Sequence, residues 1–124
     1  MIIYKSLITR NDLRANRQSL FVFGDNMVRK GMGGQAREMR GEPNAVGIIT
    51  KLLPTMSENA FLTDSLFGVW YNTSKPDFDR LFMFSGAIFW PKAGIGTGRA
   101  QLQTRAPAIW KELEHIRHRL ERLK

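Results

Sequence analysis

The sequence predicts an α/β domain with a compact, largely parallel sheet flanked by helices and with a long helix near the carboxyl end. Short apolar runs, typical of buried strands, alternate along the chain with segments of helical periodicity, and this order favours a parallel sheet with helices on both faces. The chain of 124 residues is large enough for one domain core and too small for two. We therefore treat residues 1–124 as a single domain.

Four strands are expected, each bounded by turn residues. Residues 1–8 alternate polar and apolar side chains, and residues 20–23 form a short, wholly apolar run. Residues 45–50 are a third strand, which ends at Lys51, and residues 87–90 are the last. In a parallel sheet the loops that leave the carboxyl ends of these strands lie at one edge.

The helices follow from periodicity and from capping residues. They are expected over residues 11–18, 34–40, 59–71, 76–84 and 104–123. Asn11 is the expected N-cap of the first, and Gly41 and Pro43 end the second. Pro76 opens the fourth, with a strand over residues 81–84 as the competing interpretation.

The last predicted helix has the clearest pattern in the chain. Its apolar residues, separated by four, three, four and three positions, are Ile109, Leu113, Ile116, Leu120 and Leu123. They form one stripe, which either packs on the sheet or forms a seam between two protomers. We expect packing on the sheet and a monomer.

Composition limits the chemistry. The chain has no cysteine, which excludes disulfides, zinc–thiolate sites and thiol nucleophiles. No apolar run approaches the length that spans a bilayer, so we expect a cytoplasmic protein that does not contact a membrane. His115 and His118 lie among arginines, so a solvated basic face is expected there; neither a metal nor a cofactor is expected. The net charge of +8 favours an anionic ligand, DNA and RNA included.

Two glycine-rich loops mark the candidate site. The first glycine loop, residues 31–34, follows the second strand, and the second glycine loop, residues 94–98, follows the last strand. Glycine has no Cβ, so backbone N–H groups in such loops approach an anion closely at the start of a helix. Two such loops on one sheet edge, beside Lys51, predict a diphosphate ligand.

These residues resemble the macrodomains, a family that binds ADP-ribose. Residues 20–26, followed by Gly31-Met32-Gly33-Gly34-Gln35-Ala36, are similar to the family's strand, its Asn-x-x-Asn segment and its first phosphate loop. Residues 90–98 look like the strand, proline and second phosphate loop. Residues 47–51 look like a strand ending in Thr-Lys that occurs in two hydrolytic branches, the terminal ADP-ribose glycohydrolases acting on protein and the antitoxin macrodomains acting on DNA. The resemblance covers residues 4–120.

The resemblance implies a role for each matching residue and a macrodomain-like fold. Lys51 and Asn26 are implied to be the catalytic residues, and Asn26 is implied to contact the distal ribose. Contacts with the rest of the ligand are implied for Asp25, Gly31, Gly33, Gly34, Gln35, Ala36, Thr50, Gly94, Ile95, Gly96, Thr97 and Gly98. Arg99 follows the second glycine loop directly, where its charge would assist the phosphates.

The sequence also departs from the family. Ser6-Leu7 replaces the Gly-Asp pair whose carboxylate reads adenine, so base selectivity stays open, with Asn11 or Asp12 as substitutes from the next turn. Phe23 replaces the first asparagine of Asn-x-x-Asn. Gly98 stands where the protein-directed branch has an aspartate, so turnover stays open as well. The closing strand of many macrodomains has no counterpart after the last helix.

Plainer interpretations compete at several positions. Lys51 is otherwise an exposed lysine closing a strand, and Asp25 a turn residue bonding its own backbone. The tryptophans Trp70, Trp90 and Trp110 lie in apolar runs, which favours core packing over base stacking. Arg40 is free to pair with either Glu42 or Asp25.

Three functions remain. The first is an ADP-ribosyl glycohydrolase acting on nucleic acid or protein, in which the Lys51 amine, deprotonated by desolvation or by a cationic neighbour, attacks the anomeric carbon. The second is a module that sequesters ADP-ribose or a related nucleotide without turnover. The third is a basic nucleic-acid-binding module whose glycines only form turns.

Overall fold

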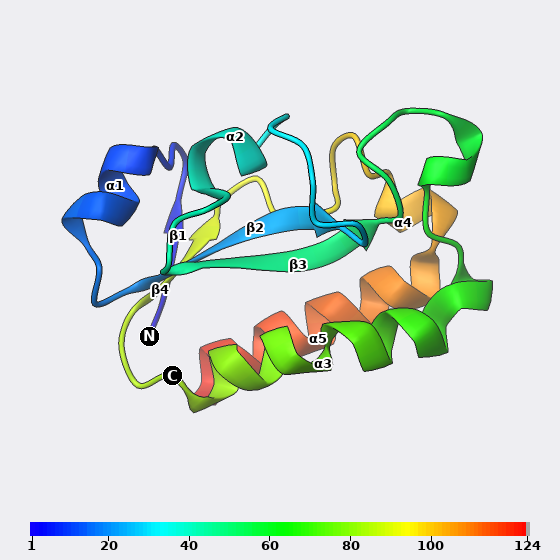
Figure 1. Ribbon diagram of the computed structural model, residues 1–124. Coiled ribbons are helices and arrows are strands. Elements are labelled where there is room, and N and C mark those ends of the chain that lie inside the picture. The colour runs from blue at the N-terminus through cyan, green and yellow to red at the C-terminus, as the bar shows by residue number, and fades with distance from the viewer. Residues whose placement is uncertain (124) are drawn as a thin grey trace.

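The protein is a four-stranded sheet in which every pair of neighbouring strands is parallel (Figure 1). The computed structural model describes residues 1–123. The strands are β1 (Ile2–Lys5), β2 (Leu20–Asn26), β3 (Ala45–Lys51) and β4 (Ile88–Pro91), in the spatial order β1-β4-β2-β3. The predicted α/β class with a parallel sheet is confirmed.

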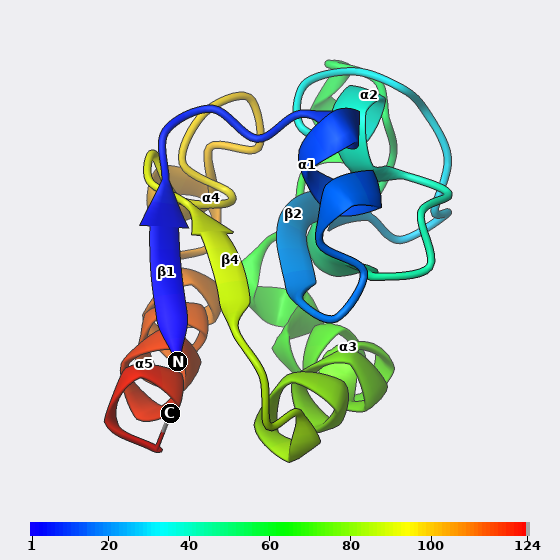
Figure 2. The same cartoon turned by 90° about the vertical axis from the view of Figure 1, so that its left-hand side faces the viewer.

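Helices cover both faces of the sheet (Figures 1 and 2). The two long helices, α3 (Phe67–Met83) and α5 (Pro107–Leu123), lie side by side on one face, and α1 (Arg10–Ala15) and α2 (Ala36–Met39) lie on the other. Because side chains alternate along β2, Leu20 and Val22 belong to the larger core under the long helices, whereas Phe21 and Phe23 belong to a smaller core under α1 and α2.

The apolar stripe of α5 packs against the sheet, as expected. Ile109, Leu113, Ile116 and Leu120 are buried in the larger core, and only Leu123 at the end of the helix is exposed. The helix begins at Pro107, where the missing N–H costs nothing, and the Asp64 carboxylate accepts a hydrogen bond from the N–H of Ala108 at 3.0 Å. Within residues 1–123 no helix combines the length and apolar character needed to cross a bilayer.

The predicted start of α1 at Asn11 is wrong. Thr9 is the N-cap, with its hydroxyl accepting from the N–H of Asp12 while the Asp12 carboxylate accepts from the N–H of Thr9 at 2.8 Å. This reciprocal pair satisfies two backbone donors at once, which a cap at Asn11 would leave open.

In place of the two helices predicted over residues 59–71 and 76–84, the structure has one helix, α3, with Pro76 inside it. The helix begins only at Phe67, and the segment before it holds two 3-10 turns, Glu58–Ala60 and Asp64–Leu66. Trp70, Ser74, Phe78 and Leu81 are its buried residues, so one packed face runs past the proline. The ring of Pro76 lies on the exposed side. Tertiary packing therefore outweighs the lost hydrogen bond, and the alternative strand at residues 81–84 is excluded.

Four further elements have boundaries that differ from the predictions. β1 ends at Lys5, and β2 continues to Asn26 because its pairing with β3 extends to Asn26 and Lys51. The helix expected over residues 34–40 is the single turn α2. The last helix is preceded by a separate turn, α4 (Leu102–Arg105), and Pro107 begins the new helix.

Candidate functional site

A pocket of about 370 Å³ lies at the carboxyl ends of β2 and β3 and brings both glycine loops together with Lys51. Every site residue predicted above lines it except Ile95, whose buried side chain belongs to the larger core. The parallel sheet explains this convergence, since loops from distant parts of the sequence leave its strands at the same edge.

Backbone donors in both loops have no acceptor. Within residues 1–123, the N–H groups of residues 31–36 and of residues 95–100 make no hydrogen bond. Buried backbone N–H groups are normally paired, and Ala36 and Ala100 are themselves buried residues. These two rows of free donors suit the oxygens of an anionic ligand. Because α2 and α4 are single turns, helix dipoles contribute less here than the sequence suggested.

Any side chain at Gly96 would force the second glycine loop to move. Its φ is +77°, and a Cβ there would lie 2.9 Å from Leu102 Cδ2 and 3.2 Å from Thr50 Cγ2. Gly31 has a φ of +100°, and a Cβ there would lie 3.1 Å from Pro54. The glycines therefore let both loops approach their neighbours closely.

Gln35 joins the two glycine loops. Its Oε1 accepts from the N–H of Gly24 at 2.9 Å, and its Nε2 donates to the carbonyl of Gly94 at 3.1 Å. Both ends of this amide are thus used within the fold. Gln35 positions the second loop against β2, a role that the sequence did not indicate.

Asp25 is buried and holds two arginines. One carboxylate oxygen contacts Arg40 at 2.5 Å and the other contacts Arg29 at 3.2 Å. Arg40 also donates to the carbonyl of Gly31 at 2.7 Å, which ties the first glycine loop to this ion pair. Of the two partners expected for Arg40, the structure selects Asp25. The Asp25 carboxylate also accepts from the N–H of Asn26 at 2.8 Å, as the turn interpretation expected.

The side chains of Asn26 and Thr50 also form hydrogen bonds within the protein. The Asn26 amide donates to the carbonyl of Lys30 at 2.7 Å and closes the turn that starts the first loop. The Thr50 hydroxyl donates to the carbonyl of Asp25 at 3.2 Å. Both residues are buried, so they shape the wall of the pocket.

Lys51 is not an exposed strand-closing lysine, since only 8% of it is exposed. Its amine donates to the carbonyl of Thr55, lies 3.4 Å from the sulfur of Met56, and stands 4.8 Å from the centre of the Phe61 ring. Burial lowers the pKa of this amine, and the charge of Arg99 lowers it further. No carboxylate in residues 1–123 forms an ion pair with it.

The pocket is basic. Lys30, Arg40, Lys51 and Arg99 line it, against the one carboxylate of Asp25. Arg99 forms no ion pair or hydrogen bond within the described chain, and its Nη1 would lie 3.5 Å from a Cβ on Gly33. Its charge is therefore available at the gap between the two loops.

Sequence reasoning missed part of this wall. The additional lining residues are Gly24, Lys30, Arg40, Leu53, Pro54, Met56, Ala93 and Ala100. The loop over residues 52–58 directly follows Lys51, and that adjacency was the available signal. Nothing in the sequence shows that this loop folds back to place a carbonyl on the lysine amine.

Comparison with known proteins gives a family and no function. Neither the curated proteins nor the solved structures contain a significant match to the chain. The model of a family of unknown function, DUF7831, matches residues 3–116, which is most of the sequence. The chain therefore belongs to DUF7831.

Proposed function

We propose that this protein binds ADP-ribose, or a closely related nucleotide, in the pocket between its two glycine loops, and that Lys51 releases ADP-ribose from a nucleic acid or a protein. The observation that carries the proposal is the pair of loops whose backbone N–H groups have no acceptor, at residues 31–36 and 95–100 of the described chain. Two such rows on one pocket suit two linked phosphates better than one.

The charges of the pocket support an anionic ligand. Arg99 lies at the gap between the loops without a protein partner in residues 1–123, and Lys30 lies at the rim. Asp25 offers no free negative charge to repel phosphate, because Arg29 and Arg40 neutralise it. The loops thus provide directed donors, and the arginine provides charge.

The state of Lys51 supports a nucleophilic role. Its lowered pKa increases the fraction of neutral amine, which is the reactive form. In the proposed step Nζ forms a bond to the anomeric carbon, and the glycosidic bond breaks with its electron pair leaving on the attached base or carboxylate. The ammonium proton passes to the leaving group or to solvent, and water then hydrolyses the adduct and frees the amine. For attack, the amine must leave the carbonyl of Thr55.

Binding without turnover is the second candidate, and one observation favours it. The Lys51 amine and the Asn26 amide are both held by backbone carbonyls, those of Thr55 and Lys30. Gly98 adds no carboxylate to the site. A protein that sequesters the nucleotide would need no more than the loops and Arg99.

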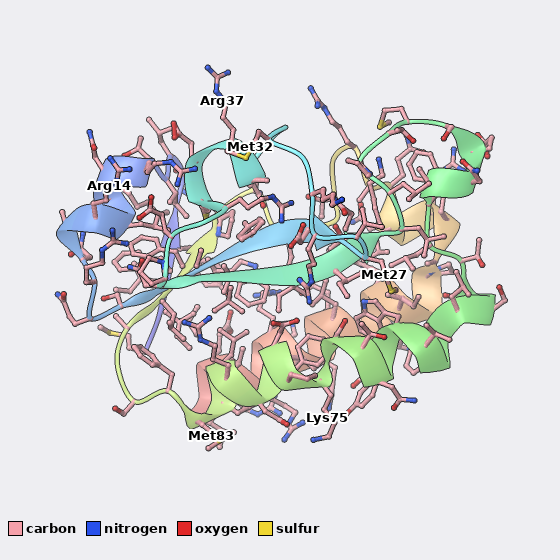
Figure 3. The ribbon with its side chains drawn as sticks, viewed as in Figure 1. Arg14, Met27, Met32, Arg37, Lys75 and Met83 are labelled. Atoms are coloured by element: carbon pink, nitrogen blue, oxygen red, sulfur yellow. The ribbon has the colours of Figure 1, made fainter. Side chains whose placement is uncertain are left out.

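An assay for released ADP-ribose decides between these candidates. The substrates are ADP-ribosylated DNA and ADP-ribosylated protein, each in large excess over the protein described here. We expect the wild type to release free ADP-ribose and Lys51→Ala to lose activity by about 100-fold or more while keeping its affinity for ADP-ribose. Lys75→Ala is the control, because Lys75 projects from α3 on the face of the sheet opposite the glycine loops (Figure 3).

Two results would contradict the enzymatic role. Equal release by wild type and Lys51→Ala would remove the lysine from the chemistry. Saturable binding of ADP-ribose with no release from either substrate would favour the sequestering module.

A further inference from the structure

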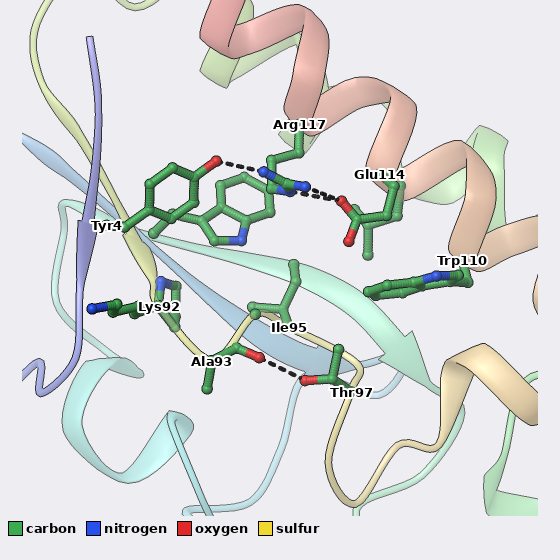
Figure 4. A pocket seen from close by; sticks show the side chains of 12 residues that line it. Tyr4, Lys92, Ala93, Ile95, Thr97, Trp110, Glu114 and Arg117 are labelled. Carbon is green, nitrogen blue, oxygen red and sulfur yellow. Dashed lines mark hydrogen bonds and ion pairs between the residues drawn. The ribbon is translucent and has the colours of Figure 1, made fainter.

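A second pocket, of about 220 Å³, lies on the other side of the second glycine loop, between β1, β4 and α5 (Figure 4). It shares Ala93, Gly94 and Thr97 with the first pocket, so the two cavities are separated only by this loop. One extended ligand that crosses the loop could therefore occupy both.

Aromatic side chains flank this second pocket. Figure 4 shows Tyr4 and Trp110 on opposite sides, with Ile95 between them. Arg117 fixes the Tyr4 side, donating to the Tyr4 hydroxyl at 2.6 Å and to one Glu114 oxygen at 2.7 Å. A cavity with flat aromatic sides and a fixed polar edge suits a planar ring.

Polar groups without partners also point to a ligand. Trp90 is 1% exposed and lines the pocket, yet its indole N–H has no acceptor in residues 1–123, and neither has that of Trp110. The indole of Trp70, by contrast, donates to the carbonyl of Ile49 at 2.8 Å. A buried indole normally has a partner for its N–H, so the N–H of Trp90 is free for a ligand acceptor, whereas Trp110 is only half-buried.

Glu114 supplies the complementary acceptor. Its Oε2 accepts a hydrogen bond from Arg117, whereas its Oε1 accepts none from the described residues. The pocket therefore offers indole donors and one carboxylate acceptor to the same ligand. This combination matches the edge of a ring that carries an amino group beside a ring nitrogen.

We propose that the second pocket binds an amino-substituted nitrogen heterocycle of nucleobase size, the base of the nucleotide whose phosphates lie in the first pocket. The ring stacks on Trp110 beside Ile95, one of its nitrogens accepts from the indole N–H of Trp90, and its amino group donates to Glu114. This inference rests on the proposed function for the identity of the ligand, and on the second pocket alone for the position of the base.

Calorimetric titration of the protein with AMP, and with IMP, which has a carbonyl in place of the amino group, tests whether the base binds in the second pocket. We expect Trp110→Ala to weaken AMP binding by about 10-fold or more, as expected for loss of a stacking partner, and to leave the affinity for ribose 5-phosphate unchanged. Lys111→Ala is the control, because Lys111 is the next residue of α5, exposed and outside the pocket. The wild type should prefer AMP to IMP, and Glu114→Gln should remove that preference, a readout that does not depend on the folding of Trp110→Ala.

The outcomes separate this inference from the proposed function. Wild-type binding of AMP that neither Trp110→Ala nor Glu114→Gln changes would overturn the inference while leaving ADP-ribose binding intact. Absence of AMP binding to the wild type would overturn it too. Trp110-dependent AMP binding without any ADP-ribose binding would uphold the second pocket and contradict the proposed function.

Discussion

Lys51 ends β3 with its amine in a buried, cationic environment, and the pKa of that amine is the property on which its chemistry depends. Burial and Arg99 both disfavour the charged form, so the pKa lies below its ordinary value of 10.5. The folded state therefore binds fewer protons than the unfolded state between the lowered pKa and 10.5, and the contribution of Lys51 to stability rises with pH across that window.

The pKa of Lys51 is measurable by NMR titration of a lysine labelled at the carbon next to the amine. We expect a midpoint below 10.5 in the wild type and a higher midpoint in Arg99→Gln, because the repulsive charge is gone. A midpoint that Arg99→Gln leaves unchanged would show that Arg99 does not act on the amine.

Asp25 is a structural residue by its contacts, although it lines the pocket. Its substitution by Asn leaves Arg29 and Arg40 without their shared carboxylate, and we expect a loss of about 2–4 kcal/mol in the free energy of unfolding. Urea denaturation measures it. The control is Asp79→Asn, which breaks an exposed pair with Lys75 and should cost less than about 1 kcal/mol. Similar losses for the two variants would contradict the central role of Asp25.

Residue identities at the site were predictable, and their partners were not. The order of motifs placed Asp25, Gln35 and Lys51 at one pocket wall, and the structure puts them there. The contacts that fix their side chains come from Arg40, from the carbonyl of Gly94 and from the carbonyl of Thr55. Such contacts depend on the three-dimensional course of loops, which periodicity does not encode.

The second glycine loop owes its shape to Gly96 more than to Gly98. Ala at Gly96 would meet Leu102 and Thr50 and would have to hold a positive φ, so we expect a loss of about 2 kcal/mol or more. At Gly98 no atom lies within 4 Å of a Cβ, so Gly98→Ala should unfold close to the wild type. Thermal unfolding of both variants compares them, and equal melting temperatures would show that the loop adapts.

Glu42, in the turn after α2, pairs with three arginines in and just after α1. It pairs with Arg10 at 2.7 Å, with Arg17 at 2.8 Å and with Arg14 at 3.4 Å. Hydrogen bonds from Arg10 and then Arg17 lower the pKa of Glu42 from 4.5 to about 2.

The lowered pKa of Glu42 predicts how stability depends on acid. Its contribution is complete above pH 4.5 and is lost as the pH falls from 4.5 to about 2. The melting temperature of Glu42→Gln should therefore lie below that of the wild type at neutral pH, and the two should converge near pH 2. A gap that is constant from pH 7 to 2 would contradict this assignment.

Elements were predicted best where one apolar pattern is unbroken. β3 and the packed stripe of α5 follow from continuous apolar runs and regular spacing. The prediction of α3 was wrong because Pro76 was taken as a helix start, whereas the buried face that includes Trp70 and Phe78 continues through it. Burial against the sheet decides this segment, and burial is known only after the chain has folded.

At the scale of the molecule, charge and topology act together. The net charge is +8, and the parallel sheet gathers both glycine loops, Lys51 and Arg99 at the carboxyl edge of its strands. The sequence was sufficient for this convergence because it depends only on the strands being parallel, so that their carboxyl ends lie at one edge. The second pocket was not predictable, since Tyr4 of β1 and Trp110 of α5 lie near opposite ends of the sequence and line one pocket only in the folded chain.

Calorimetric titration of the protein with ADP-ribose, beside ADP and ribose 5-phosphate at moderate salt, tests the central claim most directly. The account predicts saturable binding of ADP-ribose with one site per chain, tighter than that of either fragment, and weakened by Arg99→Gln. Folded protein that gives no heat with any of the three ligands would contradict it, and the basic surface would then be the better lead to function.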